Sequence, residues 1–287
     1  MAAPRLLVVQ LDRTDPVGPL GDWLIAAGLE LDVRDLSAAD DLPPDLSRHA
    51  GLIVLGGGIG ASDDDVAPFL PAVRALLRQA VSAEVPTLGI CLGHQLLALA
   101  NGGRVGRNPL GPELGAQLIA KRAAASTDPL FGPLPITPDV IQWHFDAVTT
   151  LPPGALQLAS SPGCDQQAFR LGRLAWGLQF HIETTPDVLR DWVGEDAARL
   201  GEDYDWDTIL ARAIDAHDDV AEVWQPFAVA FADVVRAPSA VAPARGVPTS
   251  TAEPITDPAA IRAALAAEAT ASRTVLPMPG LRTPGHD

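Results

Sequence analysis

Short apolar runs alternate with stretches of helical periodicity over the first hundred residues. Each run has the length of a buried strand, and the stretches between runs place apolar residues at helical spacing. We expect strands at residues 5–11, 30–35, 52–55 and 87–90, and helices at residues 20–27, 66–83 and 93–100. Strands that alternate with helices are typical of a mostly parallel sheet that helices cover.

The pattern changes in the middle of the chain, where short β-rich segments are separated by Pro, Gly or Asp. These segments are residues 117–120, 140–143, 156–159, 167–171 and 174–180. They predict a second set of strands that is partly antiparallel. Two helical stretches follow at 186–200 and 206–235, the second with an apolar stripe. The expected fold class is therefore α/β, with an open, mostly parallel sheet, flanking helices and a small antiparallel sheet.

The composition shifts after Arg236 to Ala, Pro, Ser and Thr, and aromatic residues are absent. Such a segment buries too little apolar surface to offset its ordering entropy. We expect one domain over residues 1–236 and a disordered or loosely packed tail over 237–287, in which 259–269 could form a short helix. The alternative is that this tail is an arm that binds a partner.

The charge balance and the cysteine count narrow the function classes. A net charge of −16 argues against a nucleic-acid partner, because binding a phosphate backbone needs a basic face. The first apolar run stops at Gln10, too early for a signal peptide or a membrane span, which favours a cytoplasmic protein without a membrane partner. Cys91 and Cys164 are too few for a disulfide framework; one disulfide between them stays open, but we expect reduced thiols. Neither HExxH nor a spaced Cys/His set is present, so we expect no metal and no other cofactor.

The most informative stretch is residues 89–93, Gly-Ile-Cys-Leu-Gly, which lies between a predicted strand and a predicted helix. This is the cysteine version of the nucleophile elbow, a sharp turn in which flanking side chains would clash with the crossing backbone. The turn exposes Cys91 at the carboxyl edge of the sheet, where the helix N-terminus favours a thiolate. The backbone N–H of Leu92 then points toward an oxyanion on the attacked carbon. The alternative is a tight turn with a buried structural cysteine.

The continuation to Gln95 resembles the nucleophile motif of the class I (triad-type) glutamine amidotransferases, G-x-C-x-G-x-Q. Gly89, Cys91, Gly93 and Gln95 all match it. The resemblance covers roughly residues 1–235 and implies a flavodoxin-like sheet. It also implies that Gln95 contacts the glutamine.

A second stretch, residues 177–183, resembles the family signature Q-F-H-P-E. His181 would take the proton of Cys91 and later give one to the leaving amine, while Glu183 fixes the tautomer of the imidazole. Ile182 stands where the family usually has proline, which puts the aim of Glu183 in question. The alternative is a histidine at a strand end beside a solvated glutamate.

The third stretch, Gly-Gly-Gly-Ile-Gly at residues 56–60, resembles the Gly-Gly-Pro oxyanion loop of the family. The resemblance makes Gly57 or Gly58 the second oxyanion donor. A dinucleotide site is excluded, because Gly60 is followed by Ala-Ser-Asp-Asp-Asp, whose charges would repel phosphate.

Residues 143–146, Trp-His-Phe-Asp, resemble the W-H-x-D segment of some free-standing relatives and, loosely, of the glutaminase domain of GMP synthase. The resemblance implies that the segment holds the substrate, with His144, Phe145 and Asp146 as candidates. Backbone at Phe145 and Asp146 would hold the α-carboxylate, and the Asp146 side chain would pair with the α-ammonium. The alternative is a tryptophan and a histidine packed between the sheet and a loop.

The function that we expect is hydrolysis of a γ-glutamyl amide through a thioester on Cys91, with a small-molecule substrate such as glutamine. The sequence contains no S-G-G-x-D-S pyrophosphatase loop, so a separate synthase subunit would receive the ammonia, or hydrolysis is the whole activity. The nearest alternative is a γ-glutamyl peptidase that acts on γ-glutamyl conjugates. Two others are a non-catalytic regulatory module and a thiol sensor in which Cys164 lies near Cys91.

Overall fold

The computed structural model describes residues 3–201 and 204–241, and its main sheet has eight strands. In spatial order the strands are β2 (Glu30–Asp35), β1 (Arg5–Gln10), β3 (Gly51–Val54), β4 (Thr87–Ile90), β12 (Ala175–Leu178), β11 (Ala168–Leu171), β10 (Leu156–Ser160) and β7 (Ala120–Lys121). The first five run parallel, and from β12 onward each neighbour is antiparallel. The α/β class is confirmed.

Two further strand pairs lie outside this sheet. They are β5 (Arg104–Arg107) with β9 (Asp146–Thr150), and β6 (Glu113–Leu118) with β8 (Asp139–His144), both antiparallel. A bridge between Ile141 of β8 and His181 ties the second pair to the chain just after β12. The bridge brings the end of β8 toward the carboxyl edge of the parallel strands, where open α/β sheets place their sites.

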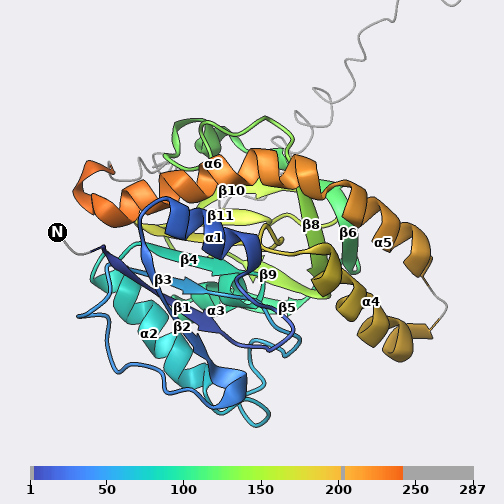
Figure 1. The fold of residues 1–287 in the computed structure, drawn as a ribbon, viewed down its shortest axis with the longest axis horizontal. Helices are drawn as coiled ribbons and strands as arrows, with labels where there is room; N and C mark the ends of the chain where they lie inside the picture. The colour runs from blue at the N-terminus through green and yellow to red at the C-terminus, as the bar shows by residue number, and fades with distance from the viewer. Residues whose placement is uncertain (1–2, 202–203, 242–287) are drawn as a thin grey trace, which may run out of the picture. The chain divides into compact units, whose positions relative to one another are not determined.

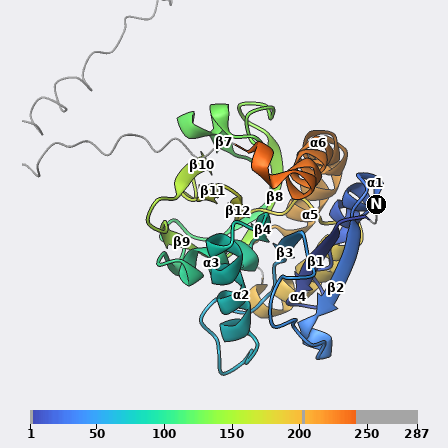
Figure 2. The same ribbon diagram turned by 90° about the vertical axis from the view of Figure 1, so that its left-hand side faces the viewer.

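Helices cover both faces of the main sheet (Figures 1 and 2). The α-helices are α1 (Gly18–Ala26), α2 (Leu70–Ser82), α3 (Leu92–Ala100), α4 (Pro186–Leu200), α5 (Trp206–Asp215) and α6 (His217–Arg236). Short 3-10 turns lie at η1 (Leu36–Ala38), η2 (Ala123–Thr127) and η4 (Pro238–Ala240). Because successive strand residues point to opposite faces, β1 gives Leu6 and Val8 to a core with α1 and α6, and Leu7 and Val9 to a core with α2 and α3.

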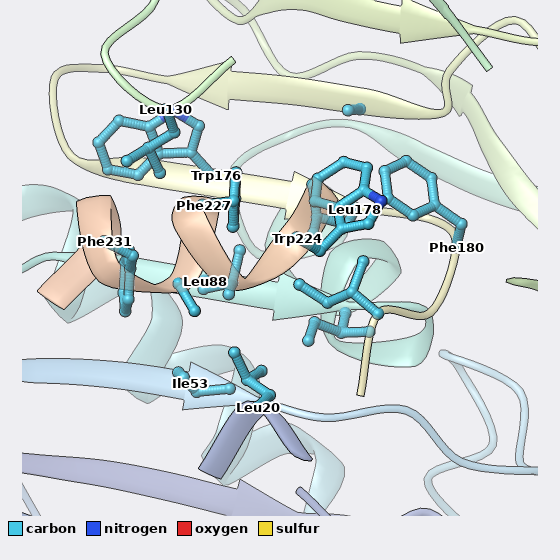
Figure 3. Close-up of a cluster of buried hydrophobic side chains, with 14 of the residues drawn as sticks. Leu20, Ile53, Leu88, Leu130, Trp176, Leu178, Phe180, Trp224, Phe227 and Phe231 are labelled. Carbon is cyan, nitrogen blue, oxygen red and sulfur yellow. The ribbon is translucent and has the colours of Figure 1, made fainter. Parts of the chain in front are cut away.

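The core under α6 is rich in aromatic side chains. Figure 3 shows Trp224, Phe227 and Phe231 of α6 in one cluster with Trp176 and Leu178 of β12. Trp176 and Phe231 meet edge to face with ring centroids 6.4 Å apart. This dense packing holds β12, and therefore the residues that follow it, firmly against the sheet.

Several boundaries differ from the sequence-based expectations. The helix expected at 206–235 is two helices that meet at Ala216, and the helix expected from residue 66 begins at Leu70. β5 and β9 were not expected, because their strands are short and polar. Both cysteines are free, so no disulfide joins them. Within residues 3–201 and 204–241, no helix has the length and apolar character that a membrane crossing requires.

The end of the described chain packs on the domain. Arg173 donates a hydrogen bond to the carbonyl of Val241 at 3.2 Å, and Val241 itself is buried. Residues 242–287, which hold most of the expected tail and the helix expected at 259–269, lie outside the described residues.

Candidate active site

Cys91 lies at the turn between β4 and α3 with a φ of 49°, in the left-handed region that non-glycine residues rarely adopt. The turn closes only because of the glycines that flank it. A Cβ on Gly93 would lie 2.0 Å from the Val54 carbonyl oxygen, and one on Gly89 would lie 2.5 Å from the Gly93 carbonyl oxygen. Backbone strain of this kind clusters at functional sites, and it presents the sulfur at the start of α3.

The Cys91 sulfur is nearly buried and has polar neighbours. The amide Nε2 of Gln179 lies 3.8 Å from Sγ, and the Trp143 carbonyl oxygen lies 3.9 Å from it. The Cys91 backbone N–H donates to the carbonyl of Leu178 at 2.8 Å, which continues the pairing of β4 with β12. The nucleophile candidate is thus tied to the strand that leads to His181.

His181 and Glu183 form a buried hydrogen-bonded pair just after β12. The Nδ1 of His181 and the Oε1 of Glu183 are 2.6 Å apart, and the two residues are 2% and 1% exposed. Burial acts to lower the pKa of His181, but Glu183 and Cys91 outweigh it and raise that pKa well above its ordinary value. Because its protonated form is stabilised in this way, His181 can hold the proton that Cys91 gives up.

Ile182, where the family usually has proline, contributes a hydrogen bond that proline could not make. Its backbone N–H donates to Oε2 of Glu183 at 2.8 Å, while Oε1 faces His181. Because proline has no N–H, the substitution gives this carboxylate a second fixed contact. The loss of proline therefore leaves Glu183 aimed at His181.

The glycine loop after β3 packs against this group. A Cβ on Gly57 would lie 3.4 Å from Leu92, so these two residues are neighbours. The N–H of Gly58 donates to Oδ2 of Asp12 at 3.1 Å, and that amide is therefore engaged. Across residues 3–201 and 204–241, the N–H groups of Gly57 and Leu92 donate no hydrogen bond to a backbone or side-chain acceptor.

A pocket of about 710 Å³ opens beside Cys91. Of the site residues expected from sequence, all except Glu183 line it, and Glu183 lies behind His181. Sequence reasoning missed Asp12 and Asp15 from the loop after β1, and Trp192 from α4, which also line the pocket. The signal for the two aspartates was their place directly after the first parallel strand, at the edge where sites gather.

The Trp143–Asp146 segment is held in place by buried polar contacts. The His144 ring nitrogens lie 3.0 Å from the Asp146 carbonyl oxygen and 3.1 Å from Oε2 of Glu113. Gln95 Nε2 donates to the same Asp146 carbonyl at 3.1 Å. His144 and Gln95 therefore hold the backbone of the segment in place. The His144 side chain is buried and hydrogen-bonded, as expected under the alternative of a packed histidine.

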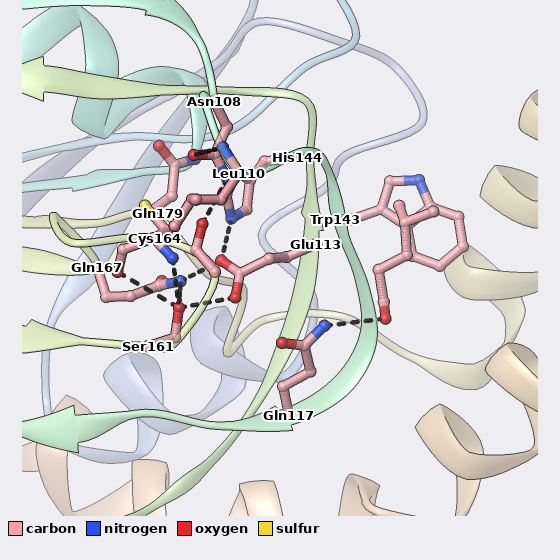
Figure 4. Close-up of polar contacts among 12 residues, drawn as sticks. Asn108, Leu110, Glu113, Gln117, Trp143, His144, Ser161, Cys164, Gln167 and Gln179 are labelled. Atoms are coloured by element: carbon pink, nitrogen blue, oxygen red, sulfur yellow. Dashed lines mark hydrogen bonds and ion pairs between the residues drawn. The ribbon is translucent and has the colours of Figure 1, made fainter.

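Glu113 is the centre of the network behind that segment (Figure 4). Besides its contact with His144, it accepts hydrogen bonds from Ser161 Oγ at 2.7 Å and from Gln167 Nε2 at 2.6 Å. Cys164 lies in the same cluster, with ligand atoms of Glu113, His144 and Cys164 all within 4.8 Å of one another. The hydrogen bonds already satisfy Glu113 and His144, so these two side chains do not require a metal ion.

Charged and aromatic side chains surround the pocket mouth. The guanidinium groups of Arg107 and Arg199 lie 6.0 Å and 4.8 Å from the ring centroid of Phe145. Arg107 also pairs with Asp146, with Nε and Oδ1 3.5 Å apart. The Asp146 carboxylate therefore already has a cationic partner at the rim.

Comparison with known proteins gives a consistent result. The glutamine amidotransferase-like protein YfeJ of Salmonella typhimurium is 29% identical over 201 residues, which cover 69% of this chain and 83% of that protein. A glutamine-hydrolyzing GMP synthase of Aeropyrum pernix is 32% identical over 174 residues, 58% of this chain but only 31% of that protein. Gamma-glutamyl peptidase 3 of Arabidopsis thaliana is 29% identical over 150 residues, 50% of this chain and 59% of that protein.

A solved structure and a family model agree with these relatives. The crystal structure of a glutamine amidotransferase from Thermotoga maritima superposes with a TM-score of 0.72 at 26% identity, covering 81% of this chain and 100% of that one. The family model described as glutamine amidotransferase class-I matches residues 22–193, which include both Cys91 and His181. The chain belongs to the class-I glutamine amidotransferase family.

Proposed function

We propose that this protein hydrolyses a γ-glutamyl amide through a thioester on Cys91. The observation that carries the proposal is the placement of three groups: a strained cysteine at a helix start and a buried histidine, which line one pocket, and behind them a glutamate 2.6 Å from Nδ1 of the histidine. Nucleophile, base and orienting carboxylate in that order are the parts that acyl transfer needs.

The first half of the reaction forms the thioester. His181 takes the thiol proton, and the Cys91 sulfur attacks the side-chain carbonyl carbon of the substrate. The backbone N–H groups of Gly57 and Leu92 would stabilise the resulting oxyanion, since neither donates a hydrogen bond within the described residues and the two residues are neighbours. The C–N bond then breaks, His181 returns its proton to the leaving nitrogen, and ammonia or an amine departs.

The second half regenerates the enzyme. His181 removes a proton from a water molecule, which attacks the thioester carbon. The C–S bond then breaks to release glutamate, and His181 returns the proton to the Cys91 sulfur. Glu183 stabilises the imidazolium in both halves through its short contact with Nδ1. Gly58, the other expected oxyanion donor, contributes less to this account because Asp12 occupies its N–H.

Recognition of the α-amino-acid end is assigned to the Trp143–Asp146 segment. Main-chain groups at Phe145 and Asp146 would hold the α-carboxylate, since Gln95 and His144 fix this backbone from behind. The Asp146 side chain would exchange its contact with Arg107 for the substrate ammonium. Gln95 then acts mainly through the backbone that it holds.

Two uses of the chemistry follow. Supply of ammonia to a separate synthase subunit is supported by the similarity to GMP synthase. Cleavage of larger γ-glutamyl conjugates is supported by the similarity to a gamma-glutamyl peptidase and by the pocket volume of about 710 Å³. A pocket of this volume can hold a substrate larger than glutamine.

Steady-state turnover of glutamine and of γ-glutamyl dipeptides, measured by released ammonia or amine, tests the proposal. We expect Cys91→Ala to lower turnover at least about a thousandfold with little change in melting temperature. Cys164→Ala is the matched control, because its backbone rather than its thiol bonds to Ser161. Unchanged turnover in Cys91→Ala would refute the proposed chemistry, and a preference for dipeptides would favour the peptidase role.

A further inference from the structure

Asp15 is a buried carboxyl group beside the proposed triad that the mechanism above does not use. It lies in the loop after β1, is 2% exposed, and lines the pocket. Oxygen atoms of Asp15 and Glu183 and a ring nitrogen of His181 all lie within 4.8 Å of one another. Within the described residues, no donor reaches Oδ1 of Asp15, although an ionised carboxylate this deeply buried needs donors.

Two glycines make room for this contact. A Cβ on Gly56 would lie 2.0 Å from Oδ2 of Asp15 and 3.1 Å from Cε1 of His181. Gly18 has a φ of 45°, and a Cβ there would lie 2.1 Å from the Glu183 carbonyl oxygen. Side chains at either position would push the Asp15 loop away from the His181–Glu183 pair, so the close approach is built into the fold.

Trp192 fastens the loop from the other side. Its Nε1 donates to the carbonyl of Thr14 at 2.9 Å, and its ring packs on His181 with centroids 4.8 Å apart. The Trp192 side chain therefore contacts both Thr14, which precedes Asp15, and His181, the proposed base. Asp15 cannot move independently of His181 without breaking these contacts.

Burial, first, and then the charges that face Asp15 determine its protonation. They are His181, Glu183 and Asp12, one imidazole against two other carboxyl groups. Burial raises the pKa of Asp15, His181 lowers it, and Glu183 and Asp12 raise it, with a result of about 8. Asp15 therefore carries an O–H at neutral pH, and an oxygen of the Glu183 carboxylate lies within 4.8 Å of an Asp15 oxygen.

We propose that Asp15 is a positioning residue for the triad, whose neutral carboxyl group donates a hydrogen bond to Glu183 and so fixes the carboxylate that orients His181. The inference rests on the proposed function, since it assigns Asp15 a role in the same reaction. Glu183 then has three directed contacts: His181, the Ile182 amide and the Asp15 hydroxyl. In this arrangement Glu183 is charged and Asp15 is uncharged. Two ionised carboxyl groups this close would repel each other, so one of them keeps its proton.

Two variants of similar size separate hydrogen bonding from packing. Asp15→Asn keeps a donor that can reach Glu183, whereas Asp15→Leu has none. At pH 7 we expect kcat/KM of Asp15→Asn to stay within about threefold of wild type, and that of Asp15→Leu to fall about 10- to 100-fold. Wild-type kcat/KM should decline above about pH 8 as Asp15 ionises, and this decline should be absent from Asp15→Asn.

A second readout needs no substrate. The pH dependence of Cys91 alkylation by iodoacetamide reports the thiolate, and we expect its midpoint to shift in Asp15→Leu but not in Asp15→Asn. Asp128→Leu is the structural control, because Asp128 is an equally buried carboxyl group that caps the amides of Leu130 and Phe131. It should lower the melting temperature and leave the alkylation midpoint unchanged.

Identical alkylation midpoints and identical kcat/KM values for the Asn and Leu variants would overturn the role of Asp15. Failure of the proposed function looks different, because wild type itself would then turn over no γ-glutamyl amide. In that case the alkylation profiles alone decide, since they report the coupling of Asp15 to Cys91 through Glu183 and His181 whatever the substrate.

Discussion

Two buried cysteines in this protein each lie in a cluster with a histidine and a glutamate, and only one cluster has the features of an active site. Cys91 shares a pocket with His181, which bonds to Glu183. Cys164 lies with His144 and Glu113, whose facing atoms are 3.1 Å apart. The same three residue types thus occur twice, so residue identity alone does not make a catalytic centre.

The surroundings of the two sulfurs differ in backbone, access and charge. Cys91 has a positive φ at the start of α3 and faces the 710 Å³ pocket. Cys164 is enclosed, and burial, with help from Glu113 and Asp165, raises its pKa to about 12. Glu113 is occupied by Ser161 and Gln167 as well as by His144. Under the proposed function, the helix start and the cavity would make Cys91 the reactive thiol, while enclosure would leave Cys164 a structural residue.

The largest contrast that we expect is in thiol reactivity. At pH 7 a thiol with a pKa of about 12 is almost entirely protonated and, being buried, reacts only when the chain opens. Iodoacetamide should therefore label Cys91 at least about a thousandfold faster than Cys164, as followed by mass spectrometry of digested protein. The rate at which Cys91 is labelled in Cys164→Ala should match the rate in wild type. Comparable labelling rates at Cys91 and Cys164 would contradict the expected difference between the two thiols.

Removing the charge from each glutamate should separate activity from stability. Glu183→Gln should lower kcat about 10²- to 10⁴-fold, because an amide no longer supports the imidazolium. Glu113→Gln should instead lower the free energy of unfolding by about 1–3 kcal/mol, because the donors around it lose a charged acceptor. Turnover assays and denaturant titrations measure both quantities, and equal loss of kcat in the two variants would count against the contrast.

Adding one methyl group to a glycine in each cluster sharpens the same contrast. Gly56→Ala would place a carbon 2.0 Å from Asp15 and 3.1 Å from His181, and should lower kcat about 10- to 100-fold by displacing the base. Gly163→Ala would place one 2.6 Å from Glu113, and should cost about 1–3 kcal/mol of stability through overpacking. Measurements of kcat and of melting temperature for the two variants test this prediction. A wild-type kcat in Gly56→Ala would show that the glycine loop after β3 can move to accommodate the methyl group.

The smallest effect concerns the stability of the active cluster. The pKa of Asp15 is about 8 in the folded chain against an ordinary 3.8, so between these values the folded state holds a proton that the unfolded state releases. Stability therefore falls as pH rises toward 8. Asp15→Asn removes this dependence and should raise the free energy of unfolding by about 1–3 kcal/mol at pH 8 and not at pH 4. Denaturant titrations at pH 8 and pH 4 measure the free energy of unfolding of wild type and of Asp15→Asn. An equal gain in stability at the two pH values would indicate that the substitution acts through packing alone.

Most of the sheet and the three proposed triad residues could be predicted from sequence because their signals are local. The strands at 30–35 and 87–90 have the bounds expected for them, since the first alternates polar and apolar residues and the second is a short, mostly apolar segment that follows Pro86. The motif around Cys91 was readable because a strand, a turn with two glycines and a helix occupy consecutive residues.

The remainder depends on contacts between segments far apart in the chain. Asp15 meets Glu183, and Trp192 meets Thr14, only because β1 and β12 end at the same edge of the sheet. Nothing in the glycine loop itself indicates that Asp12 would take the Gly58 amide. The division at Ala216 was also missed, because the apolar stripe continues across it.

The pairing of β12 with β4 has a consequence for how the protein loses activity. Gly177 faces Gly89 and Leu178 faces Ile90 in parallel alignment, and the same ladder ends in the Cys91 amide. A slip of one residue between these strands would displace His181 by about 3.3 Å and turn its side chain to the opposite face. Turnover by the proposed mechanism would therefore report the alignment of these strands, and on heating it should be lost together with the sheet rather than before it.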